Sequence, residues 1–194
     1  MRDDIVQATS MLAMGELVVY PTDTVYGLGA DAIAADSVER VFDLKGRDRD
    51  EPLSMAVPDV DAALEHTRPT ERAEAFMREF LPGPVTVVVE RESHVPDALT
   101  AGRDRVGVRI PDHEVALELL GEFAPITATS ANRSGQVSVP DLAVLDLEIR
   151  DGVGAIVDDG ELPGGESTVV DPEQGVVHRR GPQADDIEAW LADH

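Results

Sequence analysis

Two residue types are missing or nearly missing from this chain of 194 residues. It has no cysteine, and Lys45 is the single lysine among its 16 cationic side chains. Without cysteine there are no disulfide bonds, no thiolate metal ligands and no cysteine nucleophile. Aromatic residues make up only 4% of the chain and are not clustered, which argues against a surface that stacks nucleic-acid bases.

Positive charge is also scarce. The chain carries 39 carboxylates and has a formal net charge of −23 at pH 7. One interpretation is a surface that favours solubility. The other, which the near-absence of lysine favours, is adaptation to a very salty cytoplasm, where salt screens the repulsion between carboxylates. A surface of this sign repels nucleic acid at low salt, so any contact with nucleic acid requires a local basic patch.

Long apolar segments are absent too. No run approaches the roughly 20 residues of a membrane-spanning helix, and the N-terminal sequence MRDDIVQATS has no signal-peptide core. We therefore expect a cytosolic protein that does not engage a membrane. Hydrophobic residues make up 42% of the chain, enough for a packed core. Length and the lack of linkers or repeats predict a single domain over residues 1–194.

Helical and strand patterns alternate along the sequence. Helices are predicted at residues 3–15, 36–46, 59–67, 70–80, 113–123, 140–149 and 184–194. Strands are predicted at residues 16–21, 52–57, 84–90, 105–111, 125–129, 154–160, 167–171 and 175–180. Asp36 and Glu39 form a capping-box pattern at one helix start, and Gly46 ends that helix. This order predicts an α/β or α+β domain with a sizeable mixed sheet.

Polar side chains stand near the end of several predicted strands or directly after them. They are Thr22, Arg109, Ser130, Asn132 and Arg179. Ligands of open α/β sheets bind outside the carboxyl ends of strands, so these residues are candidates for the lining of one cleft. Each of them alone is also ordinary turn or cap chemistry. Their shared ability to bind anions favours a common site.

The segment KGRDR places Lys45, Arg47 and Arg49 at the end of a predicted helix. Cations there can simply complement the helix dipole, but arginine would serve that purpose as well as lysine. A lysine ammonium is a compact charge that suits a phosphate oxygen. In a chain that otherwise avoids lysine, we expect Lys45 to reach a phosphate group.

Other familiar ligand motifs are absent. The sequence has neither the glycine-rich fingerprint of dinucleotide-binding proteins nor a P-loop. Its five histidines show no metal-ligand spacing, so we expect no histidine metal site. Asp158 and Asp159 have the chemistry to contact a metal, but a turn after a strand explains them more simply.

Seven segments occur in a characteristic order between about residues 15 and 181. They are PTDTVYGLGADA, KGR with a following PL, LPGPVTVVV, VGVRIPDH, TSANRSGQVS, ESTVVD and HRRG. In these segments the chain resembles the YrdC-like threonylcarbamoyl-AMP synthases. The resemblance implies a twisted sheet with an open cationic cleft. It also implies condensation of L-threonine, bicarbonate and ATP into threonylcarbamoyl-adenylate, with release of pyrophosphate.

The resemblance further implies a role for individual residues. The residues that match the ATP-binding positions are Lys45, Arg47, Ser130, Asn132, Ser138 and Arg179, with Lys45 and Arg47 also expected to act in catalysis. Thr22, Arg109 and Ser167 match the threonine-binding positions. No metal bound by the protein alone is implied, and Mg²⁺ is expected to arrive on the triphosphate.

The resemblance also names a destination for the product. The adenylate would pass to a tRNA threonylcarbamoyl transferase complex, which modifies adenosine beside the anticodon, and direct contact with tRNA is possible but not required. The chain departs from the family in two places. PLSMAV lacks a histidine that some members carry, and RRG replaces the usual RPG. Its length is that of the short, single-domain form.

Two other functions are compatible with such a domain. One is an RNA-binding or ribosome-assembly module that uses the basic cleft; unlike a synthase, it would not bind ATP and threonine in the absence of RNA. The other is a carbamoyl-adenylate domain like that of hydrogenase maturation proteins. That domain usually belongs to a much longer chain with zinc-finger modules, which a chain without cysteine cannot form.

The charge pattern leads to a prediction about salt. If the chain is adapted to a salty cytoplasm, its free energy of unfolding should rise with KCl concentration, because salt screens the repulsion among 39 carboxylates. Thermal melts should then show a higher midpoint in about 2 M than in about 0.1 M KCl, because the Debye length is still about 10 Å at 0.1 M and falls below about 3 Å above 1 M. Equal midpoints would contradict the halophilic interpretation.

Overall fold

The computed structural model describes residues 2–194 and contains a mixed β-sheet flanked by helices. The strands are β1 (Val18–Tyr20), β2 (Gly27–Gly29), β3 (Ser54–Ala56), β4 (Val85–Glu90), β5 (Arg105–Arg109), β6 (Ile126–Ser130), β7 (Ala155–Ile156), β8 (Thr168–Asp171) and β9 (Val176–Arg179). They lie in the order β7–β1–β2–β6–β3–β5–β4–β8–β9. The pairs β1–β7, β3–β5 and β4–β8 are parallel, and the other neighbours are antiparallel.

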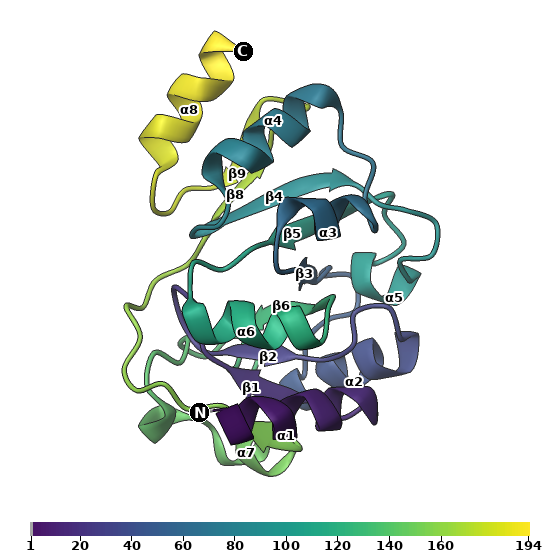
Figure 1. Cartoon of the computed structure of the whole chain (residues 1–194), viewed down its shortest axis with the longest axis vertical. Helices are drawn as coiled ribbons and strands as arrows, with labels where there is room; N and C mark the ends of the chain where they lie inside the picture. The colour runs from purple at the N-terminus through teal and green to yellow at the C-terminus, as the bar shows by residue number, and fades with distance from the viewer. Residues whose placement is uncertain (1) are drawn as a thin grey trace.

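Helices lie against both faces of this sheet. They are α1 (Arg2–Ala13), α2 (Ala35–Lys45), α3 (Val60–Leu64), α4 (Glu71–Phe80), α5 (Asp97–Thr100), α6 (Glu114–Glu122), α7 (Leu147–Asp151) and α8 (Ala184–Asp193), with a 3₁₀ turn at Leu142–Val144. Figure 1 shows α8 and the C-terminus near α4 at one end of the molecule, and α1 and α7 at the other. The Trp190 ring of α8 packs edge-on against Phe76 of α4.

The sheet separates two hydrophobic clusters. The larger cluster joins β3, β4 and β5 to α2, α3, α4 and α5. The smaller cluster joins α1 and α6 to β1, β6 and the far side of β3. Because side chains alternate along a strand, Met55 belongs to the larger cluster while its neighbour Ala56 belongs to the smaller one. Helices α1 and α6 therefore cover only part of one sheet face.

Most predicted elements are present, and the deviations have local causes. The capping box is wrong, because α2 begins after Ala34 and has no side-chain cap. The predicted helix at 140–149 is wrong as well. Two aspartates, Asp141 and Asp146, each accept a hydrogen bond from the backbone N–H two residues later, and these caps start two separate short turns. The termination of α2 at Gly46, which has a φ of 59°, is confirmed.

Strand β2 and the short helix α5 were not predicted. The sequence of β2 is Gly-Leu-Gly, and glycine is depleted in strands. In the fold, small size is what this strand requires, since a Cβ atom at Gly27 would lie 2.8 Å from the ring of Tyr20. The close approach lets the buried Tyr20 ring lie over β2, where its hydroxyl donates to the carbonyl of Thr127 on β6 over 3.2 Å. None of the helices within residues 2–194 is both long and apolar enough to cross a membrane.

Candidate active site

A cavity of about 850 Å³ occupies the part of the sheet face that α1 and α6 leave open. Strand alternation builds its floor. On β5, Val106 and Val108 are buried in the core, whereas Arg105, Gly107 and Arg109 line the cavity. A Cβ atom at Gly107 would lie 2.4 Å from the Ser54 hydroxyl. The glycine therefore keeps the middle of the floor low between two arginines.

The strand directions define two ends of this cavity. Strand β3 is parallel to β5, with Ala56 opposite Arg109, and antiparallel to β6, so that Ser130 lies beside the start of β3. We call these the Arg109 end and the Ser130 end. The four steps from Arg105 to Arg109 span about 13 Å at the usual rise of a strand. The cavity can therefore hold an extended ligand along β5.

The cavity is locally cationic in an acidic chain. The five arginines that line it are Arg47, Arg103, Arg105, Arg109 and Arg179, against the three carboxylates of Asp104, Glu166 and Asp171. The whole chain shows the opposite balance, with 39 carboxylates and 16 cations. This reversal confirms the expected open cationic cleft and favours an anionic ligand.

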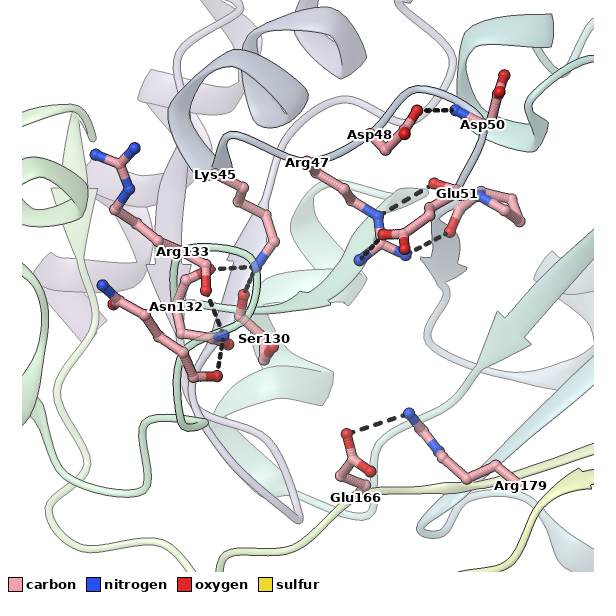
Figure 2. Close-up of polar contacts among 12 residues, drawn as sticks. Lys45, Arg47, Asp48, Asp50, Glu51, Ser130, Asn132, Arg133, Glu166 and Arg179 are labelled. Atoms are coloured by element: carbon pink, nitrogen blue, oxygen red, sulfur yellow. Dashed lines mark hydrogen bonds and ion pairs between the residues drawn. The ribbon is translucent and has the colours of Figure 1, made fainter.

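Lys45, the last residue of α2, lies behind the wall that the turn after β6 forms at the Ser130 end. Its ammonium donates hydrogen bonds to the backbone carbonyls of Ser130 and Asn132, the second over 2.5 Å (Figure 2). Only 2% of the residue is exposed. Burial, with a smaller contribution from the positive charge of Arg47, lowers the pKa of Lys45 to about 7. Lys45 thus ties the last turn of α2 to the Ser130–Asn132 turn.

The two arginines after Lys45 point in different directions. Arg47 lines the cavity, and its guanidinium donates to the carbonyls of Glu51 and Pro52, each over 3.1 Å. These bonds hold it at the Ser130 end (Figure 2). Arg49 instead pairs with Glu39 and Asp43 on the surface of α2. The cluster KGRDR therefore contributes one cation to the cavity lining and one immediately behind it.

The loop between β1 and β2 meets Arg109 at the opposite end. The guanidinium of Arg109 pairs with the Asp23 carboxylate over 2.5 Å and lies 3.5 Å from the Thr24 hydroxyl. Thr22 lines the cavity, and its hydroxyl donates to the carbonyl of Val25 over 2.7 Å. Thr22 therefore both lines the cavity and stabilises a turn, the two roles that the sequence allowed.

Ser167 and Arg179 are in direct contact at the Arg109 end. The guanidinium of Arg179 donates to the Ser167 hydroxyl and to its carbonyl, each over 3.0 Å. The Ser167 hydroxyl also lies 2.8 Å from that of Thr86, one residue before the Val87–Val108 pair of β4 and β5. Arg179 additionally pairs with Glu166 over 3.3 Å. Residues that the resemblance assigns to two different ligands therefore share one hydrogen-bond network.

Asn132 and Ser138 complete the set of predicted residues. The Asn132 side chain is buried, and its amide donates to the carbonyls of Arg133 and Gln136 over 2.8 and 2.9 Å. Its Oδ1 atom is buried and has no hydrogen-bond partner among residues 2–194. Ser138 lines the cavity. Of the nine predicted residues, seven line the cavity, whereas Lys45 and Asn132 shape it from behind.

The expectation that these residues meet outside the carboxyl ends of neighbouring strands is wrong. The polar strand ends do not share one edge of the sheet, because Arg109 and Ser130 end strands that run in opposite directions. They meet around one cavity because the cavity extends along the sheet face. Sequence reasoning also missed Arg103 and Arg105. The alternation of Arg105, Gly107 and Arg109 along one strand could have revealed Arg105.

Asp158 and Asp159 lie in a turn, as the simpler interpretation predicted. Asp158 accepts hydrogen bonds from the Tyr26 hydroxyl and from the Gly160 backbone N–H, while Asp159 lies 3.4 Å from the ring of His113. Within residues 2–194, no group of three or more histidine, aspartate or glutamate side chains is placed to hold a metal ion.

Comparison with known proteins identifies relatives of this chain. The model of the Sua5/YciO/YrdC family, described as "Telomere recombination", matches residues 10–181. A threonylcarbamoyl-AMP synthase of Pyrococcus abyssi is 40% identical over 168 residues, which are 84% of this chain and 49% of the relative. One of Bacillus subtilis is 39% identical over 173 residues, or 86% and 49% of the two chains.

A solved structure shares the fold as well. The crystal structure of P. abyssi Sua5 complexed with L-threonine matches with a TM-score of 0.81 and 40% identity, and the match covers 86% of this chain and 50% of that one. This likeness confirms the expected mixed sheet flanked by helices. The present chain spans about half the length of these relatives.

The buried ammonium leads to a prediction about pH. The pKa of Lys45 falls from its ordinary value of 10.5 to about 7 in the folded state. Between these values the unfolded chain binds more protons, so the free energy of unfolding should rise with pH, by at most about 1.4 kcal/mol per pH unit from this group. Below pH 7, where both states are charged, Lys45 should add no slope.

Denaturant titrations at several pH values would measure this effect. Lys45→Met keeps the length of the side chain and removes its titration, so the difference between wild type and variant isolates the contribution of Lys45. A difference that stays constant from pH 7 to 10 would show that the ammonium is not destabilised by burial.

Proposed function

Because the chain belongs to the Sua5/YciO/YrdC family, we propose that it is a threonylcarbamoyl-AMP synthase. It would condense L-threonine, bicarbonate and ATP into threonylcarbamoyl-adenylate and release pyrophosphate. The observation that carries the proposal is the cavity itself. It has Arg109, held by Asp23, at one end and a second cationic region at the Ser130 end. The likeness to a relative solved with L-threonine supports the choice of amino acid.

The proposed reaction needs positioning more than protein nucleophiles. The threonine amine attacks carbon dioxide and releases a proton, or attacks bicarbonate and releases water, and either route forms a carbamate. A carbamate oxygen then attacks the α-phosphorus of ATP, and the bond to pyrophosphate breaks. Such transfers are accelerated by alignment and charge neutralisation. Arginines supply both, because they bind phosphate and carboxylate through paired hydrogen bonds.

At the Arg109 end we assign the amino acid. Arg109 would bind the carboxylate of threonine, while Asp23 fixes the guanidinium from behind over 2.5 Å. Thr22 and Ser167 would offer hydroxyl groups beside it. Because Arg179 is hydrogen-bonded to Ser167, we place the reacting α-phosphate next to Arg179, where the two substrates must meet.

At the Ser130 end we assign the nucleotide. Arg47, Ser130 and Ser138 line this part of the cavity, and Asn132 has a buried Oδ1 atom without a partner. Lys45 uses two N–H groups on the carbonyls of the Ser130–Asn132 turn. A protonated ammonium has a third N–H group. We propose that a bound phosphate keeps Lys45 charged and receives this third donor.

Further components follow from the proposed reaction. Mg²⁺ would arrive with the triphosphate, because it prefers water and phosphate oxygens to an all-protein cage. The reaction uses ATP and serves tRNA, so we propose a cytosolic location. The unstable product would pass to a tRNA threonylcarbamoyl transferase complex, and the acidic surface does not require direct contact with tRNA.

The direct test is incubation of the purified chain with ATP, radiolabelled bicarbonate and threonine, followed by chromatography. A labelled adenylate that depends on all three substrates is the expected result. Binding of RNA without any adenylate would instead favour the RNA-binding module. A carbamoyl-adenylate whose formation does not depend on threonine would favour the chemistry of a hydrogenase-maturation domain.

The assignment of Arg109 makes a specific prediction. Arg109→Lys keeps the charge but loses the planar pair of donors. Its apparent affinity for threonine should fall about tenfold, or about 1.4 kcal/mol, while its affinity for ATP should change little. Steady-state kinetics with each substrate varied in turn would measure both. An unchanged threonine affinity would remove Arg109 from the proposed amino-acid site.

A further inference from the structure

Arg103 is a cavity arginine for which neither the sequence nor the comparisons supply a role. It lies between α5 and β5, is exposed, and lines the cavity. A tight turn fixes its backbone: Ala101 and Gly102 have φ angles of 53° and 72°, and the Arg103 N–H donates to the carbonyl of Thr100 over 3.1 Å. The backbone position of Arg103 at the edge of the cavity is therefore set by the fold.

The contacts of Arg103 place it at the Ser130 end. Its Nη2 atom donates to the carbonyl of Asp50 over 3.2 Å. Asp50 belongs to the loop that carries Arg47, and Arg47 is held by the carbonyls of Glu51 and Pro52 in the same loop. Two guanidinium groups from different parts of the chain therefore border the same end of the cavity.

Arg103 differs from the other cavity arginines in its charge environment. Arg47 pairs with Glu51, Arg109 with Asp23, Arg179 with Glu166, and Arg105 with both Asp171 and Glu173. Arg103 makes no ion pair with any carboxylate of residues 2–194, and its hydrogen bond goes to a neutral carbonyl. Among the five cavity arginines, it is the one whose charge is not offset by an ion pair within residues 2–194.

The chemistry of a suitable ligand follows from this arrangement. Two arginines that face one space favour a group with several anionic oxygens, and guanidinium forks match phosphate geometry. Arg109 and Arg179 lie at the Arg109 end of the cavity, about the length of β5 away from the Ser130 end. A diphosphate would therefore extend away from the reacting centre toward Arg47 and Arg103.

We propose that Arg103 binds the terminal phosphates of ATP, and the pyrophosphate formed from them, together with Arg47. The proposal rests on the proposed function, in which the α-phosphate reacts near Arg179 and pyrophosphate leaves. Arg103 supplies a positive charge without a carboxylate partner in residues 2–194, at the place where negative charge develops on the leaving pyrophosphate. The neighbouring carboxylate of Asp104 also lines the cavity, so a metal-bound phosphate is compatible with the same end.

The test uses Arg103→Gln and three probes: inorganic pyrophosphate, ATP and AMP, each with magnesium. Loss of one charged hydrogen-bond donor should weaken binding of pyrophosphate and ATP about tenfold. AMP, which lacks the terminal phosphates, should bind equally well to both proteins. Isothermal titration calorimetry measures all three affinities and needs no turnover.

Arg150→Gln is the matched control. Arg150 is also exposed and also donates to a single backbone carbonyl, that of Leu142 over 2.9 Å, but it does not line the cavity. Its variant loses the same charge and should bind pyrophosphate like the wild type. Arg103→Lys, which keeps the charge, should recover part of the affinity.

Several outcomes would overturn the proposal. They are unchanged pyrophosphate binding in Arg103→Gln, an equal loss in Arg150→Gln, an equal loss of AMP binding, and a wild type that binds no pyrophosphate. The proposed function fails separately. A wild type that binds pyrophosphate through Arg103 but forms no labelled adenylate would contradict the synthase assignment and leave the diphosphate site in place.

Discussion

The candidate site depends on one buried charge. The Lys45 ammonium lies under the Ser130–Asn132 turn and donates to two of its carbonyls. Removing a charge from water is costly, and this cost lowers the pKa of Lys45 to about 7. The contact joins the end of α2 to the end of β6, and so it fixes the wall on which Ser130 and Asn132 are displayed. Arginine, with a larger and flatter head group, should replace the lysine only in part.

The charged residues around the cavity have the opposite balance to the chain as a whole. A chain with a net charge of −23 gathers five arginines around one cavity. Most of them are partly neutralised by a carboxylate that also holds them in place, as Asp23 holds Arg109. These pairs keep the guanidinium groups ordered before a ligand arrives, which lowers the cost of binding. Arg103 is the exception, because it pairs with no carboxylate of residues 2–194 and donates to a neutral carbonyl.

The sequence predicted much of the fold, because apolar alternation and helix ends such as Gly46 are local signals. It failed where tertiary packing decided the outcome. Strand β2 exists because Gly27 leaves room for the Tyr20 ring. The site residues were predicted from motifs, but the sequence could not show that Lys45 is buried behind the cavity. Arg103 has no motif, and only the path of the α5–β5 turn places it there.

The central claim is that Lys45 serves the reaction and does more than end a helix. Single-turnover formation of labelled adenylate in Lys45→Ala tests it most directly. We predict a loss of about a hundredfold or more, the low end for removing one preorganised donor of charge stabilisation, and partial recovery in Lys45→Arg. A Lys45→Ala protein that unfolds at lower temperature but forms adenylate at the wild-type rate would contradict this account.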